Sequence, residues 1–79
     1  MNIDAIAAAR AKLEQRGVYP DRLEITGRDA AKCGIVGAGR ILGLVVATSH
    51  QSRVGGYKHP LTRYADCSGR EWEALDTGD

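Results

Sequence analysis

The sequence predicts a single α+β domain, in which an N-terminal helix packs on a small sheet of two to four strands. Three patterns support this fold class. Alanine-rich residues 3–16 carry apolar side chains three and four positions apart, which is the spacing of an amphipathic helix. Residues 22–26 alternate polar with apolar, and residues 40–48 form the longest apolar run. With 79 residues, we expect residues 1–79 to form one domain with a thin core.

The first helix is expected to run from the N-terminus to about Arg16. Gly17 can take the left-handed conformation after the last turn, and Val18 would then contact Leu13, as in a Schellman ending. The predicted buried stripe of this helix consists of Ile3, Ile6, Ala9 and Leu13.

A β-α-β unit is expected next. Leu23 and Ile25 should point from a first strand into the core. A short crossover helix, capped by Asp29 and closed by Gly34, would then lead into residues 40–48. We interpret residues 40–48 as the central strand, buried on both faces, because it is a long apolar run rich in β-branched residues and is bounded by Gly39 and by residues 49–51.

The glycines before this run invite comparison with a phosphate-binding loop. Gly37, Gly39 and Gly43 give the pattern G-x-G-x-x-x-G, which is one residue too long for the dinucleotide fingerprint. The pattern also precedes a predicted strand, whereas the fingerprint leads into a helix. We therefore interpret these glycines as a turn, with Gly43 permitting close approach of a neighbour.

The C-terminal part is predicted to hold short elements. Residues 54–57 favour a two-residue hairpin turn at the Gly-Gly pair, with a flexible loop as the alternative. Residues 61–65 suggest an edge strand, and residues 68–75 suggest a C-terminal helical turn that docks Trp72 on the core. Residues 76–79 should be a frayed tail.

The distribution of charge is uneven. Residues 5–63 hold ten Lys and Arg against four Asp and Glu, whereas residues 64–79 hold one Arg against five acidic residues. The N-terminus lacks the basic start and apolar run of a signal peptide, and no stretch approaches the ~20 apolar residues of a membrane span. We therefore expect a cytoplasmic protein with a basic body and an acidic tail.

Chemistry-bearing residues are few. The four soft metal ligands are Cys33, His50, His59 and Cys67, which are spaced too irregularly for a zinc knuckle or ribbon. We expect reduced thiols, no metal and no cofactor, although the fold could still assemble the four. With no nucleophile elbow, and with too few residues to enclose a pocket of ~300 Å³ or more, we expect no enzymatic activity.

The strongest candidate for a binding site is the segment 50–64, which contains no acidic residue and interleaves basic with aromatic side chains. Its predicted partner-binding residues are Arg53, Tyr57, Lys58, His59, Arg63 and Tyr64. Tyr and Arg are favoured anchors of protein interfaces, and the same residue types suit a phosphate backbone with exposed bases. A polar hairpin with a purely structural role is the third interpretation.

Residues 18–48 resemble a pattern found in small proteins of tailed phages and in the penetration-domain strand region of their capsid proteins. The pattern has a strand after Pro20, a short helix, and the motif G-x-x-L-G-L-x-V over residues 39–46. In size and composition the chain is also similar to phage or mobile-element accessory proteins, including the anti-CRISPR inhibitors.

The resemblance implies a non-enzymatic protein of the host-cell cytoplasm that blocks a host protein or nucleoprotein complex by protein-protein contacts. The alternatives are a weak nucleic-acid-binding protein and a self-associating structural subunit. The thin core further suggests a possible homodimer or a docked partner.

Overall fold

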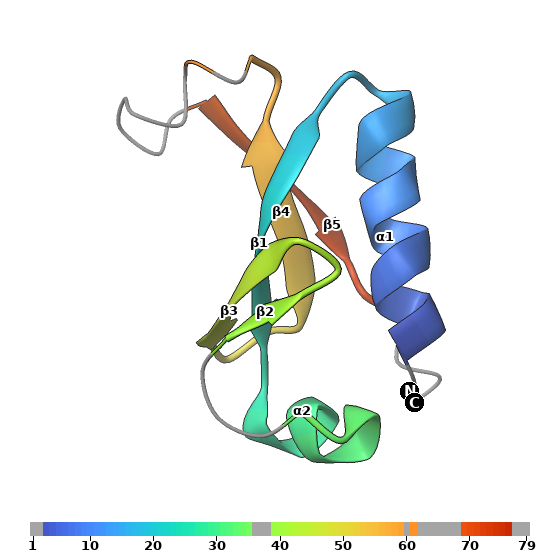
Figure 1. Cartoon of the computed structure of the whole chain (residues 1–79), viewed down its shortest axis with the longest axis vertical. Helices are drawn as coiled ribbons and strands as arrows, with labels where there is room; N and C mark the ends of the chain where they lie inside the picture. The colour runs from blue at the N-terminus through green and yellow to red at the C-terminus, as the bar shows by residue number, and fades with distance from the viewer. Residues whose placement is uncertain (1–2, 36–38, 60, 62–68, 77–79) are drawn as a thin grey trace.

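The computed structural model describes residues 3–35, 39–59, 61 and 69–76. It has the predicted α+β class, with helix α1 (Ile3–Gln15) along one face of a mixed sheet and helix α2 (Gly27–Cys33) at one end of it (Figure 1). The strands are β1 (Tyr19–Ile25), β2 (Arg40–Ile41), β3 (Leu44–Thr48), β4 (Arg53–Tyr57) and β5 (Arg70–Ala74). Their order is β2-β3-β1-β4-β5, so the sheet has five strands where two to four were expected.

Helix α1 ends as predicted. Gly17 has a φ of 76°, the nitrogen of Val18 donates to the carbonyl of Leu13 at 3.0 Å, and the nitrogen of Gly17 donates to the carbonyl of Glu14 at 3.0 Å. The predicted stripe is confirmed except at its first residue, because Ile3 is 44% exposed. Two contacts hold α1 against the edge strand β5: Arg16 at 2.9 Å and Lys12 at 3.8 Å from the carboxylate of Glu73.

The central strand is β1, and the prediction of one central strand over residues 40–48 is wrong. The chain reverses at Leu42 and Gly43, which have φ values of 52° and 79°, so that β2 and β3 form a hairpin. Both φ values are positive, as in the tight turns that match strand twist. The predicted crossover is confirmed: β3 follows α2 in the chain and pairs with β1 in parallel, with Leu23 opposite Val46.

Helix α2 begins one turn earlier than predicted. Its N-cap is Thr26, whose hydroxyl accepts a hydrogen bond from the nitrogen of Asp29 at 3.1 Å, and Gly34 ends it with a φ of 72° as expected. Asp29 is 6% exposed, and its carboxylate accepts a hydrogen bond from the hydroxyl of Ser52, the residue before β4. Asp29 thus joins the helix to the sheet and does not act as the cap.

The two predictions for the C-terminal part are wrong where the structure describes it. Residues 54–57 lie within β4, and residues 70–74 form strand β5, antiparallel to β4, where a helical turn was expected. The Gly-Gly pair serves close packing: a β-carbon at Gly56 would lie 2.1 Å from the backbone oxygen of Tyr19. The strand expected over residues 61–65 lies outside the described residues from 62 onward, as do residues 77–79.

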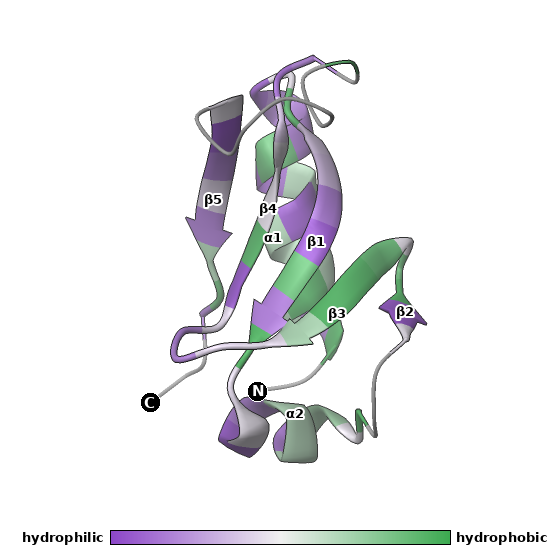
Figure 2. Cartoon of the chain, turned by 90° about the vertical axis from the view of Figure 1, so that its left-hand side faces the viewer, coloured by the Kyte–Doolittle hydropathy of each residue, from purple (hydrophilic) through white to green (hydrophobic). Residues whose placement is uncertain are grey.

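The core forms one layer between α1 and the sheet. Its buried members are Ile6, Ala9, Leu13, Val18, Leu23, Ile25, Leu44, Val54 and Leu75. Figure 2 views the molecule from another side, with α1 behind the central strands. We call the sheet face opposite α1 the open face, because no helix in the described ranges lies over it. None of the described helices has the length and apolar character needed to cross a membrane.

Candidate functional site on the open face of the sheet

One row of residues crosses all five strands on the open face. Leu23 is buried against α1, so its neighbour Arg22 points to the opposite side of β1. Directly opposed residues on neighbouring strands share a face. In register, the row reads Arg40, Val45, Arg22, Gly55 and Trp72 from β2 to β5.

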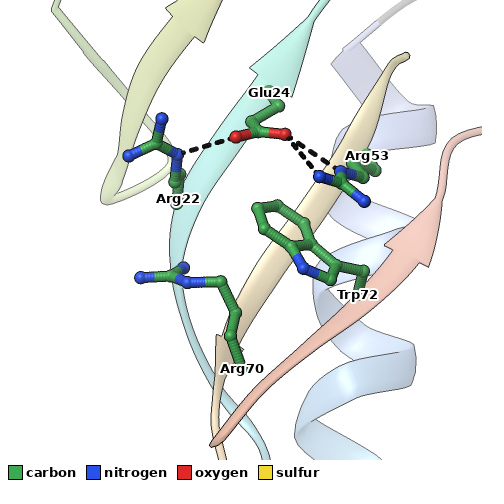
Figure 3. A pocket seen from close by; sticks show the side chains of 5 residues that line it. All are labelled: Arg22, Glu24, Arg53, Arg70 and Trp72. Atoms are coloured by element: carbon green, nitrogen blue, oxygen red, sulfur yellow. Dashed lines mark hydrogen bonds and ion pairs between the residues drawn. The ribbon is translucent and has the colours of Figure 1, made fainter. Parts of the chain in front are cut away.

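Neighbouring rows add charged and aromatic side chains. Glu24 lies opposite Arg53, and Tyr57 lies opposite Arg70. Together these strands form a pocket of about 330 Å³ on the open face, so the expectation that the chain has too few residues for a pocket of ~300 Å³ is wrong. The side chains that line it are Arg22, Glu24, Arg53, Arg70 and Trp72 (Figure 3).

Two arginines lie against the aromatic rings. The guanidinium carbon of Arg53 is 3.8 Å from the ring centroid of Trp72. That of Arg70 is 4.4 Å from the ring of Tyr57 and 5.4 Å from Trp72. Such cation-π contacts fix planar guanidinium groups in place. Tyr57 is only 4% exposed, so its ring belongs to the floor of this surface.

Two carboxylates hold three of the guanidinium groups. Glu24 accepts from Arg22 Nε at 3.1 Å and from Arg53 Nε and Nη2 at 2.9 Å. Partial burial of Glu24 raises its pKa, but hydrogen bonds and charge from Arg53 and Arg22 outweigh that effect, and the pKa lies below its ordinary value of 4.5. Glu24 is therefore ionised throughout the neutral range.

Arg70 is the most buried of these cations, with a side chain that is 12% exposed. Its Nη1 donates to Asp21 at 2.7 Å. Burial lowers the pKa of Arg70, but hydrogen bonds with Asp21 and Tyr57, and the charge of each, raise it above the ordinary value. The site is thus an ordered cationic and aromatic surface.

The predicted site residues separate into three groups. Arg53 and Tyr57 belong to the open face, on strand β4 and not on a loop. Lys58 and His59 are exposed beyond the end of β4, and Lys58 lies 3.6 Å from Glu71, so neither lines the pocket. Arg63 and Tyr64 lie outside the described residues.

The sequence reasoning missed four lining residues: Arg22, Glu24, Arg70 and Trp72. A signal for the first two was present, because they alternate with the core residues of the first predicted strand. Arg70 and Trp72 were missed because their segment was interpreted as helical. Residues two positions apart share a face in a strand but not in a helix, so the helical interpretation did not place them together.

Three of the four candidate soft metal ligands lie among the residues that the structure describes. Within the described ranges, no group of three or more His, Cys, Asp or Glu side chains could hold a metal ion. Cys33 is a free, half-buried thiol at the end of α2, His50 and His59 are exposed, and Cys67 lies outside the described residues. The pocket itself has no side-chain thiol or imidazole among its lining residues.

Comparison of the chain with protein-family models, with curated proteins and with solved structures finds no match.

Proposed function

We propose that the protein is a non-catalytic binding protein that docks a protein partner on the open face of its sheet. The observation that carries the proposal is the ordered cluster of Arg53, Trp72, Arg70 and Tyr57, of which the first three line a pocket on a face that no helix of the described residues covers. Trp, Tyr and Arg are the residues most often found as interface anchors. Because their side chains are already held, little conformational entropy is lost when a partner binds.

The phage-type role remains part of this proposal. The resemblance of residues 18–48 to small phage proteins makes a host protein or nucleoprotein complex the class of partner that we propose, with the small protein acting by occlusion of that partner's surface. The protein would act in the host cytoplasm, without a cofactor and without turnover of a substrate.

The geometry favours a protein partner over stacked bases. Proteins that bind single strands present open aromatic faces on which bases stack. Here Tyr57 is buried, and the guanidinium of Arg53 already lies over the ring of Trp72. Nucleic-acid binding is the alternative, and it predicts an affinity that falls steeply with added salt.

The test uses two matched variants. Val45 is 46% exposed on the open face, and Ala8 is exposed on α1. Val45→Gln and Ala8→Gln each place the same long, neutral side chain on one of the two surfaces. The tagged wild-type protein is first used to capture a partner from nuclease-treated host lysate, and the purified partner is then titrated against all three proteins.

We expect Val45→Gln to weaken binding of the purified partner and Ala8→Gln to leave it unchanged. If Ala8→Gln weakens binding and Val45→Gln does not, the binding site is on α1. If the wild type and both variants bind equally, neither surface is the binding site. Concentration-dependent mass in light scattering, abolished by Val45→Gln, would instead make a second copy of the chain the occupant.

A further inference from the structure

The half of the open face that lies over β2, β3 and β1 has its own chemistry. In register, Val45 of β3 stands between Arg40 of β2 and Arg22 of β1. Val45 is 46% exposed, the side chain of Arg22 is 43% exposed, and Arg40 is exposed. This half therefore presents an apolar spot between two accessible guanidinium groups.

The charge on the open face is unbalanced. Four arginines lie in its rows or line its pocket, and the carboxylates that pair with them are Asp21 and Glu24, which leaves an excess of two positive charges in the described part of the face. Arg53 and Arg70 are engaged with aromatic rings and carboxylates, as described above. Arg22 donates to Glu24 through its Nε, so the groups that face a partner are the exposed Arg40 and the terminal nitrogens of Arg22.

We propose that Arg40, Val45 and Arg22 form a subsite for an acidic segment of a partner protein, in which an apolar side chain is flanked by carboxylates. This inference rests on the proposed function, because it names the chemistry of the partner that docks on the open face. Arginine forks bind carboxylates with two parallel hydrogen bonds, and Val45 offers apolar surface to the residue between them.

The spacing agrees with a short peptide segment. Arg40 and Arg22 are on the strands that flank β3, so their backbones are about 10 Å apart, at ~4.8 Å per strand. In an extended segment the side chains of residues i, i+2 and i+4 lie on one face, so two acids that flank an apolar residue on that face are four positions apart and span ~13 Å, which the long arginine side chains can reach. Figure 3 shows the terminal nitrogens of Arg22 directed away from Glu24, so the guanidinium reaches outward while its Nε holds Glu24.

The experiment measures binding of three fluorescein-labelled peptides at low salt. The first contains Asp-Glu-Leu-Glu-Asp, the second replaces every acid by its amide, and the third replaces the leucine by serine. Labelled oligo(dT) is the fourth probe. The protein variants are Arg22→Gln, Arg40→Gln and Val45→Gln, with Arg28→Gln on α2 as the control that removes one exposed arginine elsewhere.

We expect the acidic leucine peptide to bind, and both the amide and the serine peptides to bind more weakly. Arg22→Gln and Arg40→Gln should each reduce its affinity about five- to tenfold, which corresponds to about one hydrogen bond of ordinary net strength. Arg28→Gln should leave the affinity unchanged. Because Arg22 also contacts Glu24, circular dichroism is recorded for every variant, and Arg40→Gln alone is sufficient if Arg22→Gln does not fold.

Three outcomes would overturn the subsite. Equal binding of the acidic and amide peptides would remove the preference for acids, and tighter binding of oligo(dT) that falls with the same variants would replace the acidic segment by nucleic acid. If the acidic leucine peptide does not bind at all, the subsite is also overturned. If no peptide binds but Val45→Gln still weakens binding of the purified host partner, the proposed docking face is retained and only the proposed subsite for an acidic segment is rejected.

Discussion

The ring of Trp72 on β5 occupies the place beside Gly55 of β4 where any other residue would carry its β-carbon. Two atoms of the six-membered ring, Cε3 and Cζ3, lie 2.5 Å from that position. The absence of a side chain at residue 55 is therefore what lets the indole ring cross β4 and line the pocket with Arg22 of β1. Gly55, which the sequence suggested as part of a hairpin turn, instead lies within a strand and makes room for the ring of Trp72.

Alanine at position 55 is expected to destabilise the protein by about 1 to 3 kcal/mol, the usual effect of overpacking. Gly56→Ala should be worse, because its β-carbon would meet backbone atoms of β1 at 2.1 Å and not a side chain. Gly39→Ala is the control, since nothing lies within 4 Å of its β-carbon position. Urea unfolding followed by Trp72 fluorescence measures all three, and equal midpoints would contradict the ranking.

Acidification should weaken the fold through Glu24. In the unfolded chain this carboxyl titrates near 4.5, whereas in the folded protein its pKa is lower. The unfolded state therefore takes up a proton first as the pH falls below that value, and the stabilisation by Arg53 and Arg22 is lost as the pH approaches the folded pKa.

The matched variant is Glu24→Gln, which cannot titrate at this position. We expect it to be less stable than the wild type at about pH 7 and to lose less stability between about pH 7 and about pH 3.5. Urea midpoints at the two pH values give the comparison. Parallel losses in the two proteins would show that Glu24 is not the responsible carboxyl.

Ser52→Ala is expected to cost about 1 to 3 kcal/mol, because it leaves the buried carboxylate of Asp29 without its hydroxyl donor. The same hydroxyl also accepts from the nitrogen of Thr26 at 3.2 Å, so the start of α2 should fray. Ser49→Ala is the control, since Ser49 bonds to Ile25 through its backbone nitrogen at 3.0 Å. Thermal unfolding would show the difference, and equal melting temperatures would refute it.

Two arginine ion pairs of similar length should differ in their effect on stability. Arg16 lies 2.9 Å from Glu73 with a side chain that is 45% exposed, and Arg70 lies 2.7 Å from Asp21 with a side chain that is 12% exposed. Arg16→Ala should cost less than about 1 kcal/mol. Arg70→Ala should cost about 2 to 3 kcal/mol, because it also leaves Asp21 and the ring of Tyr57 without a partner. Chemical denaturation is the measurement, and a larger effect at Arg16 would reverse the argument.

Leu42→Asn is expected to stabilise the protein by about 1 kcal/mol. Leu42 has a φ of 52° and a side chain that is 40% exposed, so a residue suited to that backbone should relieve strain and lose little burial. The hydrogen bond from Arg10 to its carbonyl, at 2.6 Å, does not depend on the side chain. A lower midpoint in urea would mean that the packing of the leucine outweighs its strain.

Helix α1 and the crossover unit could be predicted because their signals are local. The spacing of Ile6, Ala9 and Leu13 defines the buried face, and Gly17 supplies a backbone conformation that few other residues adopt. The alternation around Leu23 similarly separates the core face of β1 from the open face. In each case the residues that decide the structure are close together in the sequence, within a few turns of a helix or within a single strand.

The turn at Leu42 and Gly43 was missed because leucine carries no turn signal and Gly43 was interpreted as a site of close approach within an apolar run, whereas nothing lies within 4 Å of its β-carbon position. What reverses the chain there is the neighbouring strand: β1 pairs with β3 from Arg22 to Ile25, and β2 then folds back onto the outer edge of β3. The left-handed conformation at Leu42 is sustained by these contacts, against its local preference.

The sequence by itself determined the α+β class, the first helix with its ending, and the parallel crossover through α2, because each depends on short-range periodicity or on a residue with a special backbone preference. Only the tertiary structure decided that residues 70–74 are a strand and that Trp72 lies over Gly55. Gly55 and Trp72 are 17 positions apart, beyond the reach of local periodicity. An edge strand becomes favourable only when a partner strand supplies its hydrogen bonds and a gap for its largest side chain. The candidate site is the product of that pairing.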